Sequence, residues 1–284
     1  MIPLSLILLL AVSATACFVP PDKPGPWQVD TAYVVVTSGT RRIRSILYRP
    51  VCGDKTNGNR PAIVFGHGYL GGIERYGNIC THLASHGFYV LVPGYADLDL
   101  LFNGGRIADD LLTAVGFLDS LARRPDLDLD PYNVALVGHS MGGGAAFLAA
   151  RRDHGRHVKA VAGLSPFPAS RAVHVESLTI PVLVLAGEND RTARAESVRK
   201  QFYDPCSAPC FYLRIRSAGH NGYLDHTNVI EDRFERFNHQ SQLRAVHTYL
   251  TAFLRYYLNG DERNHPWLFG ASVRSDSTAQ GEHK

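Results

Sequence analysis

Apolar and polar residues alternate along this chain with two different periods. Segments 32–37 and 42–48 alternate at every second position, which is typical of strands with one buried face. From residue 62 onward, short continuous apolar runs alternate with longer segments of helical periodicity. Continuous apolar runs indicate strands that are buried on both sides, as in a parallel sheet covered by helices. The pattern therefore predicts an α/β fold.

The expected order of elements leaves no room for an additional domain over the sheet. Only about eighteen residues connect the apolar run 160–163 to the run 182–186, which is too short for an inserted helical cap. We expect a mainly parallel central sheet flanked by helices on both faces, with no cap domain. Buried strands are predicted at 62–65, 89–92, 134–137, 160–163, 182–186 and 211–215, and helices at 76–85, 107–121, 145–150 and 241–258.

The beginning of the chain has features of an export signal. Residues 2–12 are almost wholly apolar, whereas a helix needs about 20 residues to span a bilayer. Ala14-Thr15-Ala16 matches the pattern of a signal-peptidase site, so residues 1–16 are interpreted as a secretory signal peptide. A buried N-terminal helix is the alternative, because no basic residue precedes the apolar run. Cys17 follows the site directly and admits a lipid anchor, as in bacterial lipoproteins.

Three further segments complete the expected domain organisation. Residues 17–26 are rich in proline, cannot support a helix or a sheet ladder, and are expected to form an extended tether. Residues 27–269 are long enough to bury one sizeable core and are expected to fold as a single domain. Residues 270–284 are polar and aperiodic, so we expect a disordered tail there.

Charge and cysteine content restrict the partners. The chain of 284 residues has a formal net charge of +3 and no basic block, which disfavours nucleic acid as a partner, and we expect a monomer.

Apart from Cys17, four cysteines are present, an even number that suits disulfides in an oxidising compartment. Four cysteines allow three pairings, of which one joins Cys206 to Cys210 in a small loop before a strand and leaves Cys52 with Cys80.

The motif Gly138-His139-Ser140-Met141-Gly142 lies between an apolar run and a helix-forming segment. A strand, a tight turn that carries serine between glycines, and a helix together indicate a nucleophile elbow. The flanking glycines matter because a side chain at either position would collide with the neighbouring strand or helix. Ser140 is therefore the candidate nucleophile.

A serine hydroxyl needs a base to take its proton and a carboxylate to orient that base. Asp190 follows the apolar run 182–186 and is our candidate for the carboxylate, with Glu188 as an alternative. Either residue would also serve as the N-cap of a helix at 192–201. His220 follows the last predicted strand and is the candidate base.

The developing oxyanion needs two backbone N–H donors. Met141, next to the nucleophile, and Tyr69, in the glycine-rich loop after strand 62–65, are the candidates. We expect His139 to pack or hydrogen-bond beneath the turn and His67 to brace the backbone. Since no histidine belongs to a zinc-binding motif, we expect no metal and no cofactor.

The serine motif, the loop at Gly68-Tyr69, the segment Leu164-Ser165-Pro166-Phe167 and the order of serine, acid and histidine resemble the cutinase-like polyester hydrolases of the α/β-hydrolase superfamily. This resemblance implies an α/β-hydrolase fold and an exported serine esterase with an open cleft for bulky or polymeric esters. It also implies that Tyr69 and Phe167 flank the substrate, although the family typically has tryptophan at the second position. Core packing is the alternative for Phe167.

Other branches leave the substrate open. The segment Ala84-Ser85-His86-Gly87-Phe88 is similar to chlorophyllases and to dienelactone-hydrolase-like esterases, which share the order of the three residues. We expect Ser140, His220 and Asp190 to cleave esters through an acyl-enzyme. An acyltransferase or peptidase with the same residues, and a noncatalytic exported binding protein of this fold, are the alternatives.

Overall fold

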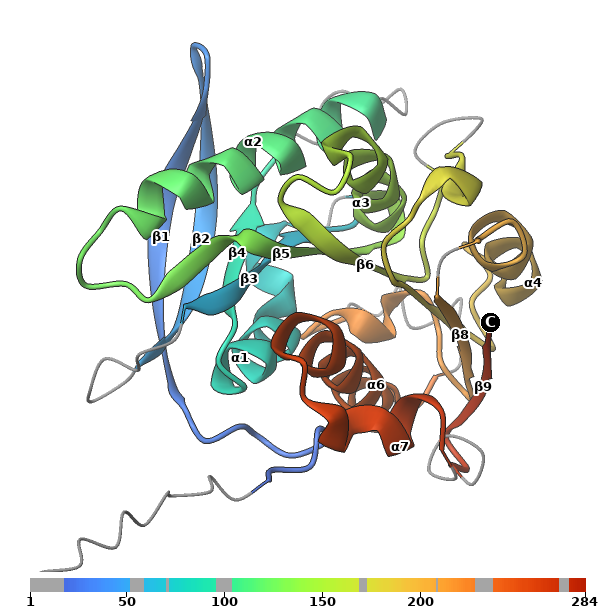
Figure 1. Cartoon of the computed structure of the whole chain (residues 1–284). Coiled ribbons are helices and arrows are strands. Elements are labelled where there is room, and N and C mark those ends of the chain that lie inside the picture. Colours follow the sequence, from blue (N-terminus) through green and yellow to red (C-terminus); the bar gives the residue numbers. More distant parts are fainter. Residues whose placement is uncertain are drawn as a thin grey trace, which may run out of the picture.

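The computed structural model describes residues 18–51, 59–69, 72–95, 104–168, 173–207, 209–227, 237–270 and 276–284. One central sheet crosses the whole body, and helices cover both of its faces (Figure 1). In the described part of the chain the sheet has nine strands in the order β1-β2-β4-β3-β5-β6-β7-β8-β9. The pairs from β4 through β8 are parallel, whereas β1, β2 and β9 pair antiparallel at the two ends. This is an α/β-hydrolase fold, as the sequence pattern predicts.

The strands lie close to the predicted positions but extend further at several ends. The strands that are longer than predicted include the first two strands of the chain and the strand that leads to the serine. The strands are β1 (Gln28–Ser38), β2 (Arg41–Val51), β3 (Arg60–Gly66), β4 (Tyr89–Pro93), β5 (Leu129–His139), β6 (Val158–Leu164), β7 (Val182–Gly187), β8 (Cys210–Ile215) and β9 (Ala279–His283).

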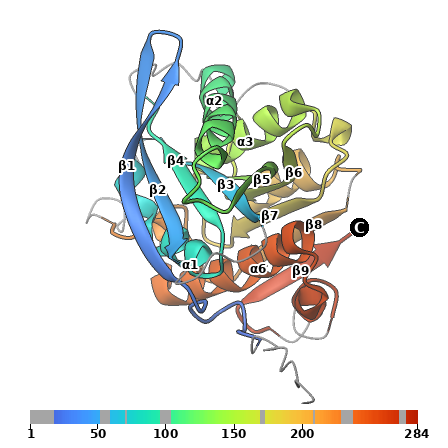
Figure 2. The same ribbon diagram turned by 60° about the vertical axis from the view of Figure 1, so that its left-hand side comes forward.

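Two helical layers bury the two faces of the sheet. Figures 1 and 2 show α2 and α3 on one face and α1 and α6 on the other. Neighbouring residues of β3 illustrate the consequence, since Val64 packs with the first layer and Ile63 with the second, and both are fully buried. The helices are α1 (Gly77–Ser85), α2 (Gly104–Ala122), α3 (Ser140–Asp153), α4 (Ala195–Val198), α6 (His239–Asn259) and α7 (His265–Leu268).

The connection from β6 to β7 carries no inserted domain in its described residues. It contains one short 3-10 turn at Val175–Ser177 before the chain enters β7. The described part of this connection therefore places no cap over the sheet edge that carries the serine. Among the helices of the described residues, none is both long and apolar enough to cross a bilayer.

The prediction of a disordered tail at the end of the chain is wrong for the residues described there. Strand β9 pairs antiparallel with β8, with Ile215 opposite Ala279 and Phe211 opposite His283. The backbone of Lys284 exchanges hydrogen bonds with that of Cys210, at 2.9 and 3.0 Å. The unpaired N–H and C=O groups at the edge of β8 can bond the backbone of another strand, whatever its side chains. The polar composition of residues 270–284 therefore does not reveal this pairing.

The segment after Cys17 has neither helix nor strand, but it does not hang free as a tether. Gly25 N donates to Ser85 Oγ at 2.8 Å, and Arg255 Nη1 donates to Val19 O at 2.8 Å. The ring of Phe18 packs against that of Trp267, with centroids 5.5 Å apart. Side chains of α1, α6 and α7 thus hold this segment against the body. The predicted signal peptide and Cys17 lie outside the described residues.

The expected disulfide between Cys206 and Cys210 is not formed. The structure has both residues, and also Cys80, as buried thiols. The Cys206 side chain, through a hydrogen bond, and burial raise the pKa of the Cys210 thiol. Backbone bonds hold this loop instead, from Cys206 N to Tyr203 O and from Cys210 to the C-terminal residue. Cys52, the expected partner of Cys80, lies outside the described residues.

Candidate active site

Strand β5 runs into helix α3 through a sharp turn at Ser140. Ser140 has a φ of 54°, a left-handed conformation that costs free energy for any residue with a side chain. A Cβ on Gly138 would lie 2.5 Å from the backbone of Gly142, and a Cβ on Gly142 would lie 2.4 Å from the carbonyl oxygen of Gly66. The turn therefore requires glycine on both sides of the serine, as expected of a nucleophile elbow.

The structure brings the three candidate catalytic side chains together in one hydrogen-bonded line. His220 Nε2 lies 2.8 Å from Ser140 Oγ, and His220 Nδ1 lies 2.8 Å from Asp190 Oδ2. All three residues are buried, and they follow β5, β7 and β8 at the same edge of the sheet. This geometry allows the imidazole to accept the serine proton while the carboxylate holds its ring and tautomer.

The two carboxylates near the end of β7 have separate partners. The second oxygen of Asp190 accepts hydrogen bonds from Thr192 N at 2.9 Å and Ala193 N at 2.6 Å. One oxygen of Asp190 therefore caps the following turn while the other contacts the imidazole. Glu188 is exposed and accepts from Ser217 N at 3.0 Å, so it is bonded away from the imidazole.

The candidate oxyanion donors lie on two segments that contact each other. Met141 is in the first turn of α3, where the helix dipole also favours negative charge. Tyr69 follows β3 and has 45% of its surface exposed. The contact between Gly142 and Gly66 joins these two segments through their backbones.

Phe167 lies beside the nucleophile through its backbone, whereas its side chain packs against the core. Its backbone N–H donates to Ser140 O at 2.8 Å, so it lies beside the nucleophile. Its side chain is partly buried and packs against the core on the α2 and α3 side.

Two other histidines support the site as expected, since His67 braces the backbone and His139 hydrogen-bonds next to the turn. His67 Nδ1 lies 2.9 Å from Gly68 O, and its ring stacks on Tyr95 with centroids 3.9 Å apart. His139 Nδ1 lies 2.8 Å from Tyr76 Oη. Burial, and then the neighbouring His220, lower the pKa of His139 well below its ordinary value.

Gln242 on α6 contacts the site and is not apparent from the sequence. Its side chain is fully buried; Oε1 accepts from Gly219 N at 3.0 Å and Nε2 donates to Gly219 O at 2.9 Å. A Cβ on Gly222 would lie 2.0 Å from Oε1. The amide thus clamps the backbone immediately before His220. The only signal in the sequence is a polar residue on the apolar face of a helix.

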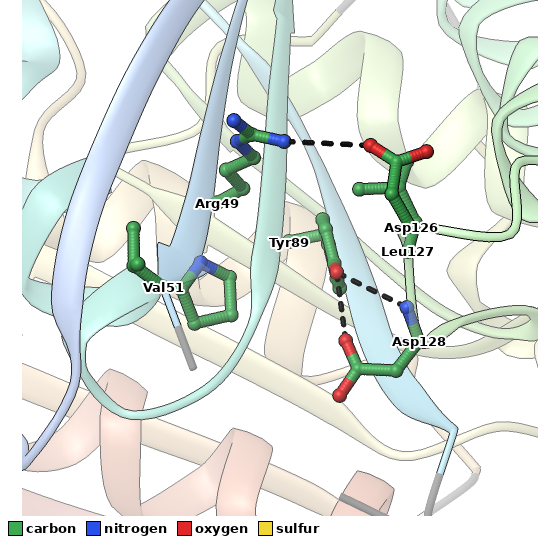
Figure 3. A pocket seen from close by; sticks show the side chains of 7 residues that line it. Arg49, Val51, Tyr89, Asp126, Leu127 and Asp128 are labelled. Atoms are coloured by element: carbon green, nitrogen blue, oxygen red, sulfur yellow. Dashed lines mark hydrogen bonds and ion pairs between the residues drawn. The ribbon is translucent and has the colours of Figure 1, made fainter. Parts of the chain in front are cut away.

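A small cavity of about 170 Å³ lies at the opposite edge of the sheet, near the start of β4 and β5 (Figure 3). Its polar groups are already paired. Tyr89 Oη donates to Asp128 Oδ1 at 2.7 Å, and Arg49 lies 3.9 Å from Asp126. The described residues contain no group of histidine, cysteine and acidic side chains arranged to hold a metal ion. The hydrogen-bonded serine site is therefore the better candidate for chemistry.

Comparisons with known proteins identify a matching family and several relatives of this chain. A family model described as PETase, PET hydrolase-like, matches residues 14–283. Chlorophyllase-2 of Arabidopsis thaliana is 25% identical over 248 residues, covering 72% of this chain and 76% of that protein. Cutinase 1 of Thermobifida cellulosilytica is 27% identical over 200 residues, covering 69% and 72%. The cutinase of Thermobifida fusca is 27% identical over 200 residues, covering 69% and 63%.

Proposed function

This chain belongs to the PET hydrolase-like family and is a carboxylic-ester hydrolase, and from that premise we propose that Ser140 cleaves its esters through an acyl-enzyme. The line of hydrogen bonds from Ser140 through His220 to Asp190 is the observation that supports this proposal most strongly. Serine, imidazole and carboxylate in this order make an alcohol nucleophilic near neutral pH.

The proposed mechanism has two acyl-transfer steps. Ser140 attacks the ester carbonyl while His220 takes its proton, and the imidazolium is stabilised by Asp190. The N–H groups of Met141 and Tyr69 stabilise the oxyanion, and losing one such donor typically costs about 3 kcal/mol in the transition state. His220 then protonates the leaving alcohol, and a water molecule activated by the same base releases the acid.

The proposed substrates are bulky or polymeric esters. Relatives include cutinases, and the described part of the β6 to β7 connection places no cap over the site. Tyr69 is exposed after β3, and the partly buried Phe167 is bonded through its N–H to Ser140 O; these two residues would bind the acyl portion. Since Chlorophyllase-2 is among the relatives, chlorophyll is a second candidate substrate.

We propose export of the enzyme through the signal at residues 1–16, with Cys17 as a candidate site of lipid attachment and a monomer as its state in solution. Mass spectrometry of the mature N-terminus tests the first two points. Cleavage before Cys17 with a mass increase indicates a lipid anchor, whereas an unprocessed N-terminus contradicts both.

Activity is tested with p-nitrophenyl esters of increasing chain length and with a polyester film, using Ser140→Ala as the control. We expect hydrolysis by the wild type and its loss in the variant. Unchanged hydrolysis by Ser140→Ala would refute the nucleophile. Products formed with added alcohols or peptides distinguish an acyltransferase or a peptidase, and inactivity on every ester favours a binding protein.

A further inference from the structure

We propose that Tyr76 and His139 are positioning residues that hold the loop carrying the oxyanion donor in its active conformation. The proposal rests on the proposed function, because it assigns the support of one of the two oxyanion donors. Neither residue contacts the reacting atoms. They act through Gly68, the residue immediately before the donor Tyr69.

A short chain of hydrogen bonds joins the oxyanion loop to the nucleophile elbow. Gly68 N donates to Tyr76 Oη at 2.8 Å, and Tyr76 Oη lies 2.8 Å from His139 Nδ1. His139 precedes Ser140 directly. The two segments that supply the oxyanion donors are therefore connected by side chains as well as by the backbone contact between Gly66 and Gly142.

The direction of these bonds follows from the donors. Since the Tyr76 hydroxyl accepts the N–H of Gly68, its own proton is available for His139 Nδ1, which then acts as an acceptor. His139 must accordingly be neutral, with its proton on Nε2. Its burial favours the neutral ring, because an imidazolium without a partner is costly in an apolar environment.

Packing leaves little freedom at this junction. Tyr76 is fully buried and His139 is 3% exposed. A Cβ on Gly68 would lie 2.9 Å from His139 Nδ1 and 3.1 Å from Tyr76 Oη, so the loop backbone rests directly on both side chains. The ring of His139 also lies 4.8 Å from that of His220 and 5.0 Å from that of Tyr223.

The backbone immediately after Tyr76 is held by a residue that follows the catalytic histidine candidate in the chain. Asp225, five residues after His220, accepts from Gly77 N at 2.7 Å and from Asn78 N at 2.9 Å. These N–H groups begin helix α1, where a carboxylate is stabilised by the helix dipole. Tyr76 thus bonds the loop that carries Gly68 and the elbow residue His139, while the two residues after it bond Asp225 in the segment after His220.

Fixed donors stabilise the oxyanion more than mobile ones, because the donors need not reorganise when charge develops. A displacement of about 1 Å away from the chemistry can reduce the rate on the order of 100-fold. Removing the Tyr76 hydroxyl leaves the N–H of Gly68 without its acceptor and releases the loop. We expect this to affect the transition state more than the ground state.

The test compares Tyr76→Phe with Tyr249→Phe. The control removes the hydroxyl of another buried tyrosine, which lies on α6 and donates to Asp276 Oδ2 at 2.6 Å, and it leaves the site intact. For Tyr76→Phe we expect kcat to fall about 10- to 100-fold with KM nearly unchanged. The affinity for an arylboronic acid, which mimics the tetrahedral intermediate, should fall in parallel. Tyr249→Phe should change neither quantity.

A double-mutant cycle with His139→Leu tests the connection between the two residues. If both act on the loop through one chain, the double variant is little slower than the slower single variant. Wild-type kcat and boronate affinity in a folded Tyr76→Phe protein would overturn the proposal, and so would additive losses in the cycle. These outcomes are distinct from failure of the proposed function. If Ser140 is not the nucleophile, Ser140→Ala stays active, and if the chain is not an esterase, the wild type hydrolyses no ester.

Discussion

Acidification should destabilise this protein through three histidines that pack between α1, α6 and the N-terminal segment. The rings of His82 and His247 are stacked with centroids 3.9 Å apart, and His86 lies 4.9 Å from His82. His82 Nε2 lies 2.9 Å from Pro21 O, and His86 Nε2 lies 2.9 Å from Lys23 O. The neutral rings of His82 and His86 each donate one proton to these carbonyl oxygens. The neutral ring of His247 stacks on His82 without charge repulsion.

Burial lowers the pKa of all three side chains. It lowers the pKa of His86 from 6.5 to about 4, with a further contribution from His82, and lowers the pKa of His247 to about 3. The nearby charges act in opposite directions, since Asp22 raises the pKa of His82 and Arg255 lowers that of His86.

The sign and size of the effect follow from proton linkage. Between pH 6.5 and 4 the unfolded chain binds protons that the folded chain does not, so the free energy of unfolding falls as the pH falls. Each pKa unit corresponds to about 1.4 kcal/mol, which gives roughly 3 kcal/mol for His86 alone. The stacked His82 and His247 add to this loss, although their contributions are not additive because their charges repel each other. Below the folded pKa of each histidine its contribution is constant.

Denaturant unfolding at several pH values measures this loss. The variant His86→Gln with His247→Phe keeps a donor to Lys23 O and a stacking partner for His82, but removes two titrating groups. We expect its free energy of unfolding to vary less between pH 7 and pH 4 than that of the wild type. Equal slopes of stability against pH in the two proteins would refute the linkage to this cluster.

Three further predictions follow from contacts around the site and at the sheet edge. Asp190→Asn should lower kcat about 10⁴-fold, whereas Glu188→Gln should change it by less than about threefold; equal kinetic losses would show that the carboxylate is misassigned. Gln242→Leu leaves both backbone groups of Gly219 buried without partners. Thermal unfolding should therefore show a free energy of unfolding lower by about 1–3 kcal/mol, and kcat should fall as well. A wild-type melting temperature would contradict this role of Gln242. Deleting residues 276–284 exposes the edge of β8, and light scattering should show aggregation and an earlier melting transition, while an unchanged monomer would make β9 dispensable.

The local pattern of the chain is sufficient for most of the fold and for the chemical identity of the site. Continuous apolar runs such as that of β7 predict strands buried on both faces, because two layers of helices must cover them. Ser140 can be found because its turn needs glycines at fixed offsets. His220 and Asp190 can be found because each follows a predicted strand, and parallel strands end at one edge of the sheet.

Other features depend on contacts between segments far apart in the chain. The polar strand β9 is stable only because β8 offers it an edge, and the proline-rich segment is held by side chains of α1 and α6. The separate roles of Asp190 and Glu188 depend on which carboxylate reaches the imidazole. Sequence alone therefore determines the order of elements and the candidate reactive groups, since these depend on neighbouring residues. Only the tertiary structure decides how Tyr76 and Gln242 support them, because hydrogen bonds join atoms by distance in space and not by separation along the chain.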